Sequence, residues 1–205
     1  MTTPILQAIE SRRTTQLFDA SRGLDDEQIQ HLVQLATTAP TSFNLQNWRF
    51  IAVRTPQAKE QLRQLAWNQP KITEAAVTFI VCGQLAKHEV MAARLAPSVN
   101  QGFMPAELVP GWEGAAKSLY FEQPQRQRDE AVRSATFGAA TLILAAQGMG
   151  LGAGPMIGFD PEGVARAFEL AGDEIPVLLL AVGYPAPGNW PQKPRRPLGE
   201  VLKLI

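Results

Sequence analysis

A polar loop near residue 40 concentrates side chains that suit a ligand with many heteroatoms. In the stretch APTSFNLQNWRF, residues 39–50, five hydroxyl or amide side chains fall close together: Thr41, Ser42, Asn44, Gln46 and Asn47. Such groups donate and accept hydrogen bonds in fixed geometry, and loops often carry binding residues. The same composition fits a turn whose Ser and Asn side chains bond their own backbone. Residue types alone leave both interpretations open.

Cationic side chains offer a second kind of chemistry. Arg12 and Arg13 end a short helix predicted over 4–11, where they would either complement the helix dipole or form a fork that matches a phosphate. Lys193 and Arg195 lie in a basic, proline-rich tail, which is typical of a solvated arm. On residue types alone, the structural interpretation of these cations is favoured over the binding one.

The elements that must position these residues follow from hydrophobic periodicity. Apolar spacing and capping residues predict helices over 4–11, 25–39, 55–66, 126–148 and 160–170. Aromatic, β-branched or continuous apolar runs predict strands over 48–53, 76–82 and 175–182, and the glycines from residue 148 predict a tight return into a short strand. We therefore expect one α+β domain over residues 1–205, with a mixed central sheet flanked by helices.

Two stretches are less regular. Between residues 84 and 122 the periodicity weakens: a helix is predicted over 87–96, whereas 97–110 mixes Gly, Pro and polar residues and is predicted to be irregular. The glycines at 148–154 formally fit the dinucleotide-binding pattern G-x-G-x-x-A. Because they follow a helix instead of ending a strand, we reject a Rossmann site.

Composition narrows the classes of function. Nineteen basic side chains balance 19 acidic ones in the 205 residues, so charge gives no reason to expect nucleic acid or an anionic membrane as a partner. The single cysteine, Cys82, cannot form an internal disulfide and is predicted to be a small buried hydrophobe. No signal-peptide core or apolar run of roughly 18 residues is present, so a cytoplasmic location is the default expectation.

Two motifs resemble the nitroreductase family of FMN-dependent reductases. The stretch APTSFNLQNWRF is similar to the family's hallmark loop, with Asn47 where the family usually has proline. The stretch PMIGFDP, residues 155–161, is similar to the segment that passes the flavin near its N5 atom. Supporting matches occur in order from Arg12 to Arg195, so the resemblance covers nearly the whole chain.

The resemblance implies a set of FMN-binding residues. An Arg-Arg-Ser-like triplet and a Lys-x-Arg pair in the tail would hold the phosphate, an Asn and a Lys three residues apart would face the pyrimidine edge, and a backbone N–H would face N5. The expected cofactor-binding residues are Arg12, Arg13, Thr14, Gln16, Pro40, Thr41, Ser42, Asn44, Gln46, Asn68, Lys71, Met156, Ile157, Gly158, Lys193 and Arg195. The expected substrate contacts are Phe43, Phe103, Met104 and Trp112. Gln16 replaces a basic residue that is common in the family, and Ile157 replaces a frequent Glu.

The implied chemistry is a ping-pong hydride transfer. NAD(P)H gives a hydride to flavin N5, and a quinone or nitroaromatic then takes two electrons in its place. The cofactor carries this reaction, so we expect no catalytic acid, base or nucleophile from the protein, and no metal site. The resemblance also implies a homodimer whose sites are built from both subunits. The departures at Gln16, Asn47 and Ile157 leave alternatives open: a reductase of a small aldehyde or halogenated aromatic, a non-catalytic flavin-binding protein, or a fold that has lost its cofactor.

Overall fold

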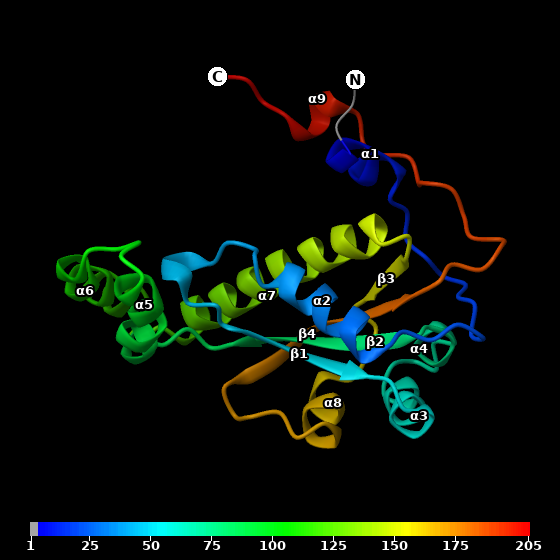
Figure 1. Cartoon of the computed structure of the whole chain (residues 1–205), viewed down its shortest axis with the longest axis horizontal. Helices are drawn as coiled ribbons and strands as arrows, with labels where there is room; N and C mark the ends of the chain where they lie inside the picture. The colour runs from blue at the N-terminus through cyan, green and yellow to red at the C-terminus, as the bar shows by residue number, and fades with distance from the viewer. Residues whose placement is uncertain (1–3) are drawn as a thin grey trace.

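An antiparallel sheet of four strands organises the computed structural model, which describes residues 4–205 (Figure 1). The strands are β1 (Trp48–Val53), β2 (Val77–Gln84), β3 (Gly152–Met156) and β4 (Glu174–Gly183), and their order in the sheet is β1-β2-β4-β3. The expected α+β class is confirmed. The sheet was expected to be mixed, but its three strand pairings are antiparallel, and parallel pairing occurs at an isolated bridge between Thr14 and Ala153.

Both faces of the central strands are covered, which explains their continuous apolar sequences. One face carries Phe79 of β2 and Leu180 of β4, and it packs against α2 (Asp26–Ala36) and α7 (Pro124–Gly148). The other face carries Ile80 and Leu179, and it packs against α3 (Pro56–Gln64), α4 (Lys71–Glu74) and α8 (Pro161–Ala167). Figure 1 shows these two helical layers above and below the sheet.

Local sequence signals begin α2 and α3 where expected. Asp25 caps α2 in a capping box: its side chain accepts from the backbone N–H of Gln28, whose own side chain accepts from the Asp25 backbone N–H. Thr55 accepts from the backbone N–H of Ala58 and Pro56 starts α3, so this cap is also confirmed.

The segment 84–122 differs from its prediction. It contains η2 (His88–Val90), α5 (Met91–Asn100), η3 (Ala106–Leu108) and α6 (Val109–Tyr120), so the prediction of an irregular stretch over 97–110 is wrong at both ends. α5 continues through Pro97, and α6 begins with a proline in its first turn. The two helices pack on each other around Leu95, Ala116 and Tyr120, at one end of the molecule (Figure 1).

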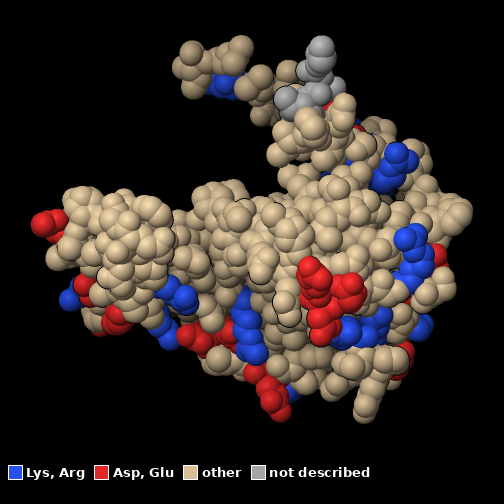
Figure 2. Space-filling view, in the orientation of Figure 1, with Lys and Arg blue, Asp and Glu red and all other residues tan. Residues whose placement is uncertain are grey.

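The two ends of the chain project from the body on the side of α7 (Figure 1). Helix α1 (Pro4–Ser11) has no buried residue, and neither has the short α9 (Leu198–Val201). Apolar side chains on both are open to solvent, including Ile5, Ile9, Leu198 and Val201. In the space-filling view the tail stands clear of the body, and charges of both signs are interleaved on the face shown (Figure 2). Among residues 4–205, no helix has the length and apolar character needed to cross a membrane.

Candidate functional site

The segment that follows α1 is held between strand β3 and the start of the tail. The backbone N–H of Thr15 donates to Ala153 O at 2.9 Å. Asn189 clamps the next two residues: its Oδ1 accepts from the N–H groups of Gln16 at 2.7 Å and Leu17 at 3.0 Å, and its Nδ2 donates to Leu17 O at 2.8 Å. Residues far apart in sequence are thereby fixed side by side. Asn189 was not among the predicted site residues.

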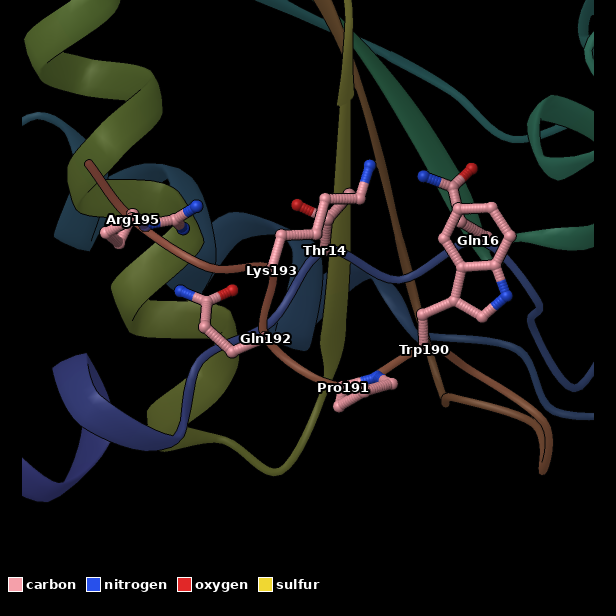
Figure 3. Close-up of a pocket in the computed structure, with 7 residues that line it drawn as sticks. All are labelled: Thr14, Gln16, Trp190, Pro191, Gln192, Lys193 and Arg195. Carbon is pink, nitrogen blue, oxygen red and sulfur yellow. The ribbon is translucent and has the colours of Figure 1, made fainter.

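A small cationic pocket forms at this junction. It encloses about 50 Å³ and is lined by Thr14, Gln16, Trp190, Pro191, Gln192, Lys193 and Arg195 (Figure 3). The Lys193 ammonium also lies 5.4 Å from the centre of the Trp190 ring. Neither Lys193 nor Arg195 forms an ion pair with any residue that the structure describes. Two unpaired cations beside a threonine hydroxyl suit an anion such as a phosphate.

The two arginines after α1 lie next to this pocket but do not line it. Arg13 instead borders a neighbouring cavity of about 310 Å³, together with Ser11, Thr15 and Gln147. Arg12 is partly buried and is not among the lining residues of either cavity. Within one protomer, therefore, Lys193 and Arg195 share a pocket with Thr14, while the contribution of Arg12 and Arg13 to the same anion stays a prediction.

Lys71 lies at the first position of α4, and its side chain is almost completely enclosed. The residue is 7% exposed, and its Nζ donates to Gln16 Oε1 at 3.1 Å. Burial lowers the pKa of Lys71 below its usual value, because desolvation disfavours the charged form. No carboxylate pairs with it in residues 4–205. A buried ammonium whose partner is a neutral amide is suited to an incoming anion.

The loop before Lys71 is joined to the 156–158 segment. Trp67 and Asn68 both have left-handed backbone conformations, with φ of 53° and 52°. Gln69 Nε2 donates to Gly158 O at 3.0 Å, and a Cβ at Gly158 would come within 2.6 Å of the Trp67 ring. Gly158 therefore permits a close approach that any side chain would block. Sequence reasoning missed both Trp67 and Gln69, since neither carries a signal without this contact.

The remaining residues of the 156–158 segment differ in their exposure to solvent. Met156 is buried at 5% exposure, whereas Ile157 is 84% exposed. The hydrogen bonds of Gln69 to Gly158 and of Lys71 to Gln16 bring the loop 67–71, the 156–158 segment and the segment after α1 to one end of the sheet.

The polar loop contains a hydrogen bond to its own backbone, and its role in ligand binding stays a prediction. It contains η1 (Ser42–Asn44), and Phe43, Asn44 and Gln46 all have positive φ, between 48° and 54°. Thr41 Oγ1 accepts from the backbone N–H of Gln46 at 3.0 Å, so the side chain that bonds the loop's own backbone is a threonine and not the expected Ser or Asn. The side chains of Asn44 and Gln46 form no hydrogen bond within the described part of the chain. Those two amides remain available to a ligand.

This loop packs against α6 and not against the Lys71 region. Ser42 Oγ lies 3.0 Å from the hydroxyl of Tyr120, whose pKa is raised mainly by burial. Phe43 makes edge contacts with Trp112 and Tyr120, at centroid distances of 6.1 and 6.4 Å. Met104 packs in the same cluster, while Phe103 is 77% exposed. Three of the four expected substrate contacts therefore lie together.

The candidate residues form two groups at opposite ends of the molecule. In Figure 1, the loop that follows α2 lies toward α5 and α6, whereas α4 and the segment after α1 lie at the other end of the sheet. A single protomer does not bring residues 40–46 next to Lys71, Gly158 and Lys193.

Comparison with known proteins decides the family. The protein-family model described as Nitroreductase family matches residues 9–184 of this sequence. The chain belongs to the nitroreductase family. It is 37% identical over 204 residues to Protein DrgA of Synechocystis sp., covering 96% of this chain and 94% of that protein. It is 31% identical over 183 residues to the NADH dehydrogenase of Thermus thermophilus, covering 85% and 83%.

A solved structure shows the same nitroreductase fold. The crystal structure from Exiguobacterium sibiricum, determined in complex with FMN, superposes with a TM-score of 0.91 over 100% of this chain and 99% of that chain, at 24% identity.

Asn47, where the family usually has proline, is fixed to the edge of the sheet. Its Nδ2 donates to Gln84 O at 2.8 Å, and Gln84 N donates back to Asn47 O at 2.8 Å. Gln84 Nε2 in turn donates to Glu174, which also accepts from Arg49 at 2.8 Å. The Asn47 Oδ1 atom is buried without a partner among the described residues. Asn47 therefore anchors the end of the polar loop to β2.

Proposed function

We propose that the protein is an FMN-dependent oxidoreductase that takes a hydride from NAD(P)H and passes two electrons to a quinone or nitroaromatic acceptor. The observation that carries this proposal is Lys71, a buried ammonium that lies against Gly154 of β3 and whose partner is the neutral amide of Gln16. The family membership, the FMN in the Exiguobacterium structure and the name of the Thermus relative support the choice of cofactor and donor.

The residues present suit FMN at both of its ends. Thr14, Lys193 and Arg195 would hold the phosphate, because the two cations have no other ion-pair partner among residues 4–205. Lys71 and Asn68 would face the pyrimidine edge, and the backbone of Gly158 would face N5. When bound, the flavin supplies hydride acceptance and release, as in other cofactor enzymes.

The protein's own part is to bind, orient and polarise. The Lys71 ammonium would stabilise the negative charge that the flavin gains on reduction, and enclosure of Lys71 strengthens that interaction, because it excludes water. Asn189 and the Thr15–Ala153 hydrogen bond would keep the phosphate pocket in register with β3.

We further propose a homodimer in which the loop 40–46 of one protomer completes the site of its partner. The two groups of candidate residues lie at opposite ends of one protomer, so a complete site needs a second copy. Exposed apolar side chains on α1 and the tail, such as Ile5 and Leu198, offer a surface for that contact. A two-fold dimer would then carry two equivalent sites.

An absorbance spectrum with stepwise additions tests the proposal. The purified protein, supplied with FMN if needed, should show a flavin band that bleaches under anaerobic NADPH or NADH and returns after menadione. Protein that binds no FMN would refute the cofactor. A band that never bleaches would favour the non-catalytic flavin-binding alternative, and one that returns only with an aldehyde or halogenated aromatic would replace the acceptor class.

A further inference from the structure

One hydrogen bond joins the two ends of the candidate flavin site within a protomer. Gln16 lines the cationic pocket with Thr14 and Lys193, and its Oε1 accepts from Lys71 Nζ at 3.1 Å. Figure 3 shows the Gln16 side chain beside Trp190 at the edge of that pocket. Gln16 is exposed, whereas Lys71 is 7% exposed. The amide of Gln16 therefore lies between the buried ammonium and the solvent-exposed side of the site.

Both members of this pair are held by the backbone around them. The Gln16 N–H is fixed to Asn189 at 2.7 Å, and the preceding residue, Thr15, is bonded to Ala153. The stem of Lys71 passes over β3 at Gly154, where an added Cβ would lie 3.6 Å from Lys71 Cδ and would overlap the Thr15 carbonyl oxygen. The Lys71 side chain therefore runs close to Gly154, and its ammonium is held by the hydrogen bond to Gln16.

We propose that Gln16 is a positioning residue that aims the Lys71 ammonium at the flavin and thereby sets how strongly the site prefers reduced over oxidised FMN. This inference rests on the proposed function. A hydride carries two electrons and one proton, so its transfer leaves the nicotinamide one unit more positive and the flavin one unit more negative. An ammonium held at the ring edge stabilises that added charge.

The chemical type of Gln16 matters for this role. A carboxylate at position 16 would pair with Lys71 and cancel its charge, and a second cation would repel it. A neutral amide oxygen orients the ammonium and leaves its charge free to act on the ligand. Gln16 therefore contributes no charge of its own, and it acts by orienting the charge of Lys71.

The first test compares Gln16→Leu with the wild-type protein, both loaded with FMN. Leucine has a similar size but cannot accept the hydrogen bond, so the ratio of affinities for reduced and oxidised FMN should fall about tenfold, which lowers the two-electron potential by about 30 mV. Gln30→Leu is the matched control, because Gln30 is an exposed residue of α2 outside the candidate site. Its potential should equal that of the wild type.

A double-variant cycle separates positioning from a direct contact. In a Lys71→Met background, the change Gln16→Leu should no longer alter the potential, because the residue it positions is gone. A side-chain NMR titration of Lys71 without flavin gives a second readout: Gln16→Leu should lower the pKa of Lys71 further, since the charged form loses its acceptor.

The outcomes distinguish this inference from the proposed function. A wild-type protein that binds no FMN would overturn both. FMN binding with an unchanged potential in Gln16→Leu, or a shift that persists in the Lys71→Met background, would overturn the positioning role alone.

Discussion

Lys71 combines a cost in stability with the chemical role proposed for it. Burial of an ammonium whose partner is a neutral amide is unfavourable, and a nonpolar side chain of similar length would avoid that penalty. Residues retained at such a cost are typical of functional sites. The flavin-free protein should therefore be less stable than a variant with a nonpolar side chain at position 71. Bound FMN should offset part of this difference in the free energy of unfolding.

We predict that Lys71→Met raises the free energy of unfolding of the flavin-free protein at pH 7 by roughly 1 kcal/mol. The pKa of Lys71 is lowered in the folded state, and its unfolded value is about 10.4. Between these two values the unfolded state binds more protons, so wild-type stability rises with pH and the advantage of the variant shrinks. Urea unfolding from pH 7 to pH 10.5 measures this. An advantage that stays constant with pH would contradict the prediction.

Cys82 provides a second test at this scale. The prediction that it is a small buried hydrophobe is confirmed, because the residue is 0% exposed, and burial together with the nearby charge of Glu174 raises the pKa of its thiol to about 12. We expect no reaction of the folded protein with a thiol-specific reagent at pH 8, since the thiolate is scarce and enclosed. In urea the same reagent should label the thiol fully. Rapid labelling under native conditions would show that β2 opens.

At the scale of elements, glycines decide how closely α7 approaches the sheet. A Cβ at Gly83 of β2 would overlap the backbone carbonyl of Ala131 in α7, and one at Gly138 of α7 would come within 2.9 Å of the Phe50 ring. Backbone cannot move aside as a ring can, so Gly83 is the stricter of the two contacts. Its place on β2 fixes the position of α7 along the sheet.

Gly83→Ala should destabilise the protein by about 2 to 4 kcal/mol, because the added methyl group forces α7 away from the sheet. The matched change is Gly114→Ala in α6, where a Cβ would meet nothing within 4 Å. This second variant should gain about 0.5 to 1 kcal/mol, because alanine favours a helix interior. Thermal unfolding of both variants, compared with wild type, checks the opposite signs.

The accuracy of the sequence predictions follows from where the physical signals are local. Strand β1 was predicted at its observed bounds, and α1 and α7 to within two residues, because caps and periodicity lie within each segment. Helix α6 was missed, since Pro110, Gly111 and Gly114 dilute its pattern and its stability comes from packing on α5.

The candidate site shows the same division. Motif resemblance predicted Lys71 and Gly158, which the structure brings to one end of the sheet. Asn189 and Trp67 were not predicted, because their roles depend on contacts with residues distant in sequence, such as Gln16 and Gly158. The relative placement of the polar loop and the cationic pocket could not be predicted either, because it depends on the fold.

At the scale of the whole molecule, the separation of the two groups of candidate site residues makes the proposed homodimer testable by complementation. If each site takes Lys71 from one protomer and the loop 40–46 from the other, two differently damaged chains should restore one another. One damaged chain is Lys71→Met. The other carries Asn44→Asp and Gln46→Glu, which place carboxylates in the loop.

Co-expression of these two variants should recover about a quarter of wild-type NADPH-dependent reductase activity, because half of the dimers are mixed and each mixed dimer has one undamaged site. Each variant alone should be strongly impaired, and the undamaged protein co-expressed with a tagged copy of itself is the control. If both groups served the site of their own protomer, every site in a mixed dimer would be damaged and no activity would return.

The clamp at Asn189 also bears on how the protein matures. Asn189 binds Gln16 and Leu17, which precede it in the sequence by 173 and 172 positions. The pocket beside this contact is lined by Lys193 and Arg195, which come later still. A growing polypeptide still on the ribosome would therefore lack the proposed phosphate end of the site until nearly all of these residues have emerged. We expect flavin loading to follow completion of the chain, so that products of premature termination stay colourless and do not drain the cell's supply of the coenzyme.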